Sequence, residues 1–99
     1  MASKPVALLL FLGDAASDRR SENFRRAFEA VGFAVELVTP KTRATRGPLR
    51  FYQHHRALLA ATAGRRAEVV MACDLYSLAA ARRMKRERRA AHVIYDARE

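Results

Sequence analysis

Acidic residues follow two apolar runs in the last third of the chain, and this pattern is the one most suggestive of chemistry. One run ends on Asp74 and the other on Asp96, with Arg98 and Glu99 close behind. Ligands of α/β proteins bind outside the carboxyl ends of parallel strands, so all four residues are candidate substrate contacts. Asp74 has a second interpretation, because an aspartate there can cap the following helix and stabilise it by roughly 1 kcal/mol. The charged cluster around Asp96 could equally be a frayed terminus.

A second candidate site is the turn that follows the first apolar run. Its residues are Gly13-Asp14-Ala15-Ala16-Ser17, which do not form the G-x-G-x-x-G pattern of dinucleotide sites. A glycine at a strand end lets a ligand approach the backbone, and the following helix N-terminus favours anions. A plain tight turn explains the same residues more simply.

The histidines and the single cysteine predict neither a metal site nor a bound cofactor. His54 and His55 are adjacent, so on a helix they point about 100° apart and cannot easily bind one ion. Cys73 is the only cysteine, which excludes an internal disulfide. It ends an apolar run, and we expect a buried small hydrophobic residue there.

Positive charge is the strongest compositional signal. The 99 residues carry a formal net charge of +9, which attracts phosphates, anionic lipid headgroups or an acidic partner. An Arg- and Ala-rich composition can also arise from the codon bias of a GC-rich genome. The densest cluster contains Arg82, Arg83, Lys85 and Arg86. It is either a solvated face that complements the helix dipole or a surface for anionic lipid or RNA.

Length and hydropathy favour one small domain without a membrane span. The longest apolar run, Pro5 to Leu12, is far below the roughly 20 residues that a spanning helix needs. We expect it to be a first β-strand and not a signal peptide. The predicted location is the cytoplasm, with peripheral binding at the inner membrane face as a variant.

The apolar periodicity alternates between strands and helices along the whole chain. Strands are expected at Val6–Leu12, Phe33–Val38, Ala67–Cys73 and His92–Tyr95, and helices from Ser17 or Asp18 to Gly32, from Pro48 to Gly64 and from Asp74 to about Arg89. This order predicts an α/β fold with a parallel sheet and helices on both faces. The first strand is apolar throughout and is placed inside the sheet, in the strand order 3-2-1-4. The second strand carries Glu36 and is expected nearer an edge.

Each helix is expected to bury one apolar stripe. In the first helix the stripe is Phe24, Ala27, Phe28 and Val31. In the second helix it is looser and consists of Leu49, Tyr52, Leu58, Leu59 and Ala63.

Together these segments resemble the N-terminal domain of GT-B glycosyltransferases, specifically the large retaining family 4. Ser17-Asp18-Arg19-Arg20, with the helix up to Gly32-Phe33-Ala34-Val35, is similar to the start of that domain. Val69–Ala79 resembles its Val-Val-x-Ala-x-Asp-Leu-x-x-Leu segment, and Val93–Glu99 resembles its Val-Tyr-Asp-x-His-Glu segment. The last two are the more specific, and the resemblance covers nearly the whole chain. Arg98 departs from the pattern, because the family usually has histidine there.

The resemblance implies that residues 1–99 form the Rossmann-like, acceptor-side part of an enzyme that transfers a sugar from a nucleotide-sugar donor to an acceptor. Gly13 and Asp14 would line the donor cleft, and the acceptor side would be bordered by Asp74, Asp96, Arg98 and Glu99. The donor-binding C-terminal domain is expected to be absent and the N-terminal domain incomplete. The chain alone is then expected to be inactive and to associate with itself through the exposed fourth strand.

Two other functions remain open. The chain could be a free-standing basic α/β module that binds nucleic acid or an acidic partner, with affinity that falls steeply with salt. It could also be a flavodoxin-like or receiver-like regulatory domain, because Asp14 and Asp74 imitate part of a receiver's acidic cluster. The lysine that receivers need later in the chain is missing, which weighs against this alternative.

Overall fold

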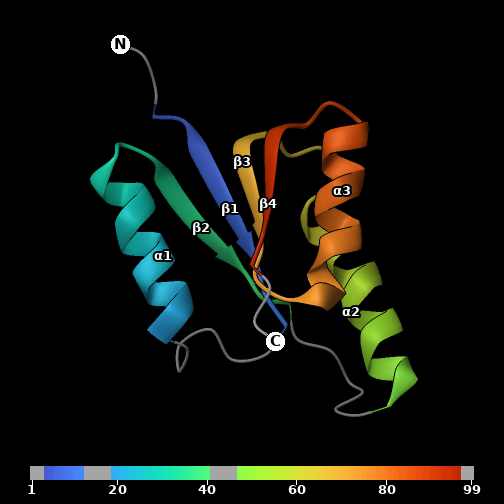
Figure 1. The fold of residues 1–99 in the computed structure, drawn as a ribbon. Helices are drawn as coiled ribbons and strands as arrows, with labels where there is room; N and C mark the ends of the chain where they lie inside the picture. Colours follow the sequence, from blue (N-terminus) through green and yellow to red (C-terminus); the bar gives the residue numbers. More distant parts are fainter. Residues whose placement is uncertain (1–3, 13–18, 41–46, 97–99) are drawn as a thin grey trace.

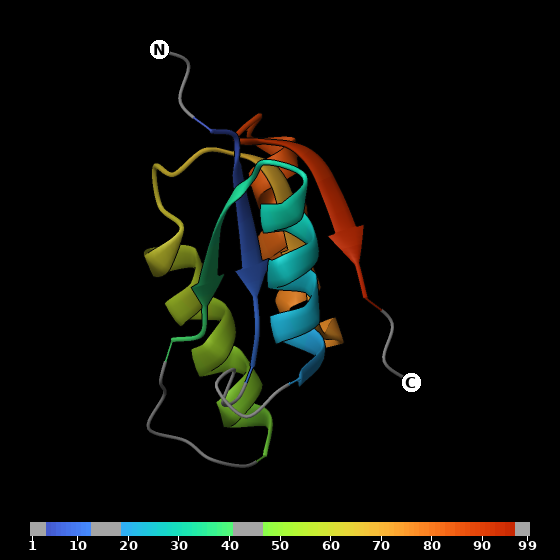
Figure 2. The same ribbon diagram turned by 90° about the vertical axis from the view of Figure 1, so that its left-hand side faces the viewer.

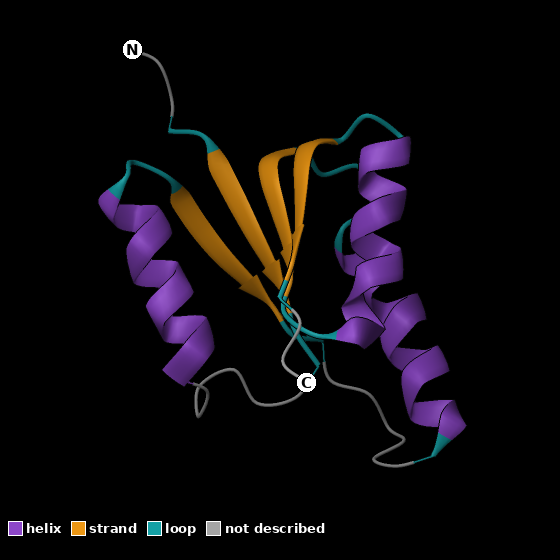
Figure 3. Cartoon of the chain, in the orientation of Figure 1, coloured by secondary structure: helices purple, strands orange, loops and turns teal. Residues whose placement is uncertain are grey.

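The four strands form one parallel sheet between two helical layers. The structure, a computed structural model, describes residues 4–12, 19–40 and 47–96. Helix α1 covers one face of the sheet, and helices α2 and α3 cover the other (Figures 1 and 3). The elements are β1 Val6–Leu10, α1 Arg19–Ala30, β2 Ala34–Val38, α2 Pro48–Ala61, β3 Ala67–Ala72, a 3-10 turn Leu75–Ser77, α3 Leu78–Arg86 and β4 Ala90–Tyr95. The predicted α/β, Rossmann-like fold is confirmed.

The strand order is β2-β1-β3-β4, with every neighbouring pair parallel. The predicted order 3-2-1-4 is therefore wrong, although the interior position of β1 is confirmed. The physical reason lies in β2 and β3. Residues Val69 to Ala72 of β3 are all buried, whereas β2 exposes Ala34 and Glu36. The strand that is apolar on both faces takes the interior place, and the half-exposed strand takes the edge.

This order places a topological switch point between β1 and β3. The chain leaves β1 toward β2 on one side and then crosses to β3 on the other side. The same order occurs in flavodoxin-like sheets, where ligands bind at that switch point, outside the carboxyl ends of the strands. The ends of β1 and β3 are therefore where the fold favours a site.

Two apolar clusters hold the layers together. Leu8, Leu58 and Met84 belong to the cluster between the sheet and helices α2 and α3. Leu9 and Cys73 belong to the cluster under α1. Full burial of a leucine or methionine side chain stabilises the fold by about 1.5–3 kcal/mol, so these layers dominate its stability. The expectation for Cys73 is confirmed, since its side chain is fully buried.

The predicted stripe of α1 is only half right. Phe24 and Phe28 pack against the cluster under the helix, but Ala27 and Val31 are exposed. The helix ends at Ala30, so Val31 lies beyond its last turn. Leu49 and Tyr52 in the stripe of α2 are also exposed, because the first turns of that helix extend below the sheet (Figure 1).

Strand β4 is bare on the side that α1 covers elsewhere. Figure 2 shows α1 in front of the middle of the sheet, with β4 standing free at one side. His92 and Ile94 pair in register with Val69 and Met71, which contact the α1-side cluster, yet both are exposed. At the other edge, Glu36 of β2 forms an ion pair with Arg65. The two edge strands therefore differ. A charged pair on β2 disfavours pairing with another chain, whereas β4 exposes an apolar side chain.

Among the described residues, none of the helices is long and apolar enough to cross a bilayer.

Candidate functional site

The carboxyl ends of β1, β3 and β4 are joined by hydrogen bonds beyond the last strand residues. Cys73 N donates to Leu10 O at 3.0 Å, and Asp96 N donates to Ala72 O at 2.9 Å. These bonds extend the ladder to the residues that follow each strand. The backbones of Asp74 and Asp96 therefore follow neighbouring strands at one edge of the sheet, as their positions in the sequence predicted.

The Asp74 carboxylate joins the end of β1 to the turn after β3, on either side of the switch point. Its Oδ2 accepts a hydrogen bond of 2.7 Å from Leu12 N. Its Oδ1 accepts from Ser77 N at 2.9 Å and from the Ser77 hydroxyl at 3.0 Å. The capping interpretation of Asp74 is thus correct, and the same side chain also fixes the end of β1. Three of its roughly four acceptor positions are occupied, so any ligand contact by Asp74 must share a carboxylate that already holds the site together.

A buried histidine extends this network, and no pattern in the sequence predicted it. His54 Nε2 lies 3.1 Å from Ser77 Oγ. The serine has one hydroxyl hydrogen, which goes to Asp74, so Nε2 must donate and Nδ1 carries the free lone pair. Nδ1 is buried and has no hydrogen-bond partner among the described residues. Burial lowers the pKa of the His54 imidazole below its ordinary value of 6.5.

These three side chains are not a hydrolytic triad, although they are of the right types. In a triad the histidine lies between the serine and the carboxylate and takes the serine proton. Here Ser77 lies between His54 and Asp74 and donates to the carboxylate. Ser77 is also fully buried, so no substrate reaches its oxygen. The network positions the turn after β3 and does not supply a nucleophile.

Asp96 is the second candidate residue that the structure describes, and its burial is unusual for a carboxylate. Only 8% of its surface is exposed. Burial of a carboxylate is costly unless the group has an interaction partner, and Asp96 has one. The other predicted site residues, Gly13, Asp14, Arg98 and Glu99, lie outside the described residues.

An exposed apolar surface lies beside the network and was missed by the sequence analysis. The rings of Phe51 and Tyr76 stack with centroids 4.0 Å apart and planes 8° apart. Tyr76 is 44% exposed and its neighbour Leu75 is 52% exposed, directly after Asp74. A helical stripe on α2 could have pointed to Phe51, but the stacking depends on the turn Leu75–Ser77, which has no sequence signature. The pair reaches the surface through Tyr76, whose exposed ring offers apolar surface to a ligand.

The basic residues of α3 fall into two groups, one paired with a carboxylate and one unpaired. Arg83 Nε donates to Glu87 Oε2 at 3.3 Å, whereas Arg82, Lys85 and Arg86 are exposed without a carboxylate partner in the described part of the chain. Glu87 also accepts from Arg89, and the guanidinium groups of Arg89 and Arg83 lower the pKa of its carboxyl.

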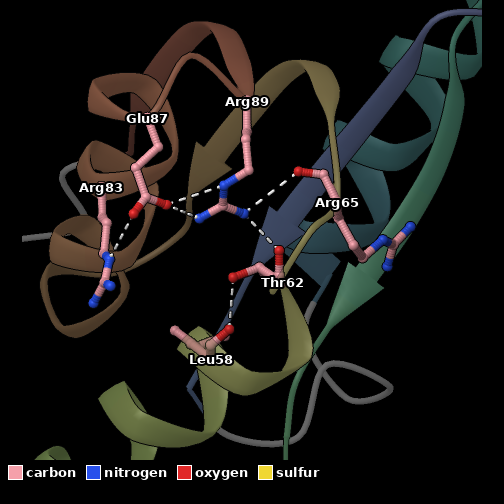
Figure 4. Close-up of polar contacts among 6 residues, drawn as sticks. All are labelled: Leu58, Thr62, Arg65, Arg83, Glu87 and Arg89. Atoms are coloured by element: carbon pink, nitrogen blue, oxygen red, sulfur yellow. Dashed lines mark hydrogen bonds and ion pairs between the residues drawn. The ribbon is translucent and has the colours of Figure 1, made fainter.

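Arg89 connects the ends of two helices (Figure 4). Its Nη1 donates to Thr62 O at 2.6 Å and to Arg65 O at 3.4 Å, while Nε donates to Glu87 Oε1 at 3.1 Å. Thr62 in turn donates its hydroxyl to Leu58 O. Part of the basic run is therefore structural, since Arg89 satisfies carbonyl groups that follow α2.

No protein-family model, curated protein or solved structure matches this chain.

Proposed function

We propose that this chain forms the acceptor-side half of a GT-B-type glycosyltransferase. In this proposal the carboxyl edge of the sheet faces the acceptor, with Asp74 and Asp96 beside it. The observation that carries the proposal is that these two residues follow neighbouring strands at the edge where α/β folds bind ligands. Gly13 and Asp14 at the donor cleft, and Arg98 and Glu99 at the acceptor side, are proposed from the resemblance alone.

The stacked pair Phe51 and Tyr76 supports an acceptor role for this edge. Apolar and aromatic surface combined with a few fixed polar groups is typical of small-molecule sites. Tyr76 is exposed and lies two residues from the Asp74 carboxylate. The aromatic face would contact the apolar side of a sugar ring or another acceptor, while Asp96 would accept hydrogen bonds from hydroxyl groups.

The bare face of β4 supports the view that the sheet belongs to a larger unit. His92 and Ile94 are exposed where the same face of β3 is buried. A further strand beside β4, with its own helix on that face, would bury both side chains. The nucleotide-sugar would bind mainly to a second domain, so this half alone would have no transferase activity.

The proposal is tested by activity and by binding with the purified chain. We expect no hydrolysis or transfer from UDP- and GDP-sugars, and we expect saturation-transfer NMR signals for free monosaccharides of the acceptor type. Tyr76→Ala should remove those signals, and Val31→Ala, which changes an exposed residue just after α1, should keep them. Turnover of a nucleotide-sugar by the chain alone, or equal signals from both variants, would contradict the proposal.

The second candidate function is a basic module that binds nucleic acid or an acidic partner. The observation in its favour is that Arg82, Lys85 and Arg86 of α3 are exposed and unpaired within the described ranges. Peripheral binding to an anionic membrane at the cytoplasmic face would use the same residues with Arg83. The logarithm of the affinity for a nucleic acid would fall linearly with the logarithm of the salt concentration. A single salt titration with RNA therefore separates this function from the first.

A further inference from the structure

An open groove of ≈ 530 Å³ lies at the amino-terminal edge of the sheet, opposite the candidate acceptor edge. It is lined by the starts of β1, β3 and β4 together with the end of α3. The charged residues in its wall are Arg66, Glu68, Lys85, Arg88 and Arg89. Neither the resemblance nor the acceptor-side proposal assigns this region a role.

Three of the four cations in the groove have no acidic partner in the described part of the chain. Arg89 is occupied by Glu87 and by the carbonyl groups of Thr62 and Arg65 (Figure 4). Arg66, Lys85 and Arg88 are exposed, and no ion pair joins them to another described residue. Glu68 is the single carboxylate in the wall, and its Oε1 lies 3.9 Å from His92 Nε2. The wall therefore presents three unpaired positive charges against one negative charge.

The backbone of Arg88 supports a role for its side chain. Helices α1 and α3 end in the same motif. In α1, Phe33 N donates to Phe28 O and Gly32 N donates to Glu29 O. In α3, Arg89 N donates to Met84 O and Arg88 N donates to Lys85 O.

The two motifs differ in the residue that adopts the left-handed conformation. Gly32 has φ +99°, and Arg88 has φ +60° as the one non-glycine residue with positive φ in the described chain. Glycine is the usual residue there because any other side chain is strained. Compensation of the helix dipole does not require Arg88, since the last turn of α3 already contains Arg83, Lys85 and Arg86. An arginine with a strained backbone that lines a groove motivates the hypothesis that its guanidinium has a function.

We propose that this groove binds a small ligand that carries two phosphate groups, held by Arg66, Lys85 and Arg88. The arginines offer paired N–H donors that match phosphate oxygens, and Lys85 adds a compact charge. A diphosphate balances the surplus of positive charge in the wall. Glu68 repels a continuous phosphodiester strand but accepts hydrogen bonds from hydroxyl groups on a small ligand. The site is independent of the acceptor-side function, because it lies at the opposite edge of the sheet.

The test is a calorimetric titration of the full chain with inorganic pyrophosphate, using sulfate as the reference anion. Arg88→Gly should weaken pyrophosphate binding at least about tenfold, the loss expected for a charge-assisted hydrogen bond. Arg82→Gln removes the same charge from α3 outside the groove and should change binding by less than about threefold. Thermal unfolding of Arg88→Gly should occur at the same or a higher temperature than in the wild type, because glycine relieves the strained backbone.

Three results would overturn the proposal. The first is no binding of pyrophosphate, or binding no tighter than that of sulfate. The second is an equal loss in Arg88→Gly and Arg82→Gln, which would indicate a general charge effect. The third is binding of RNA or of vesicles with anionic lipid that depends on Arg88 and that pyrophosphate does not displace, which would assign the groove to a polyanion or a membrane.

Discussion

His54 Nε2 and Ser77 Oγ lie 3.1 Å apart in the interior, and this contact links α2 to the turn after β3. The Ser77 hydroxyl donates a hydrogen bond to the Asp74 carboxylate. That carboxylate also accepts a hydrogen bond from Leu12 N, just after β1. One chain of hydrogen bonds therefore fixes the carboxyl edge of the sheet from helix to strand. One polar atom of this network is unsatisfied, because Nδ1 of His54 is buried without a partner among the described residues.

Stability should fall as the pH drops below about 6.5. Burial lowers the folded-state pKa of His54 from 6.5, so between the two pKa values the unfolded chain binds more protons than the folded chain. The contribution of His54 is therefore constant above the unfolded pKa, decreases as the pH falls and is fully lost below the folded pKa. Urea unfolding at several pH values from about 7.5 to 5 measures how the free energy of unfolding depends on pH. His54→Gln, whose amide can still donate to Ser77, should reduce the change in unfolding free energy with pH. An equal slope in His54→Gln and the wild type would contradict this account.

Asp74→Asn should destabilise the fold by about 1–2 kcal/mol. An asparagine has one oxygen, so either Leu12 N or Ser77 N would face an N–H group in place of an acceptor. Chemical denaturation at neutral pH gives the difference in free energy of unfolding. Glu68→Gln, an exposed carboxylate at the other edge, should change it by less than about 0.5 kcal/mol. A loss of that small size in Asp74→Asn would mean that the hydrogen bonds to Leu12 and Ser77 are not important for stability.

The sequence predicted the element order and the positions of Asp74 and Asp96 after two strands, because both depend on local patterns. Apolar runs marked the strands, and the positions of Asp74 and Asp96 after them followed directly. The strand order was wrong because it depends on the comparison of two strands, of which β3 is the more deeply buried. The network of His54, Ser77 and Asp74 was not predictable, since 23 residues separate His54 from Ser77. Such contacts arise only when α2 packs beside the turn after β3.

The exposed edge of β4 should make the chain associate with itself. An apolar edge strand that carries no charged side chain to prevent pairing is a template for association with another chain. Ile94 of β4 is 41% exposed. Analytical ultracentrifugation should show an average mass that rises with concentration, despite the net charge of +9. Ile94→Lys should remain monomeric. Val31→Lys introduces the same charge at a residue that is 72% exposed beside α1, and it should associate like the wild type. A monomeric wild type at all concentrations, with cooperative unfolding at high temperature, would favour the free-standing basic module.

The most direct test of the proposed glycosyltransferase half is the coding sequence downstream of the Glu99 codon, read from the transcript of the source cell. The proposal predicts that it continues, in frame or after one frameshift, into further strands and a second α/β domain. That domain should be the donor-binding one, with a site for the nucleotide-sugar. A stop codon directly after Glu99, with no such domain in any downstream frame, would contradict the proposal and leave the basic module as the better account.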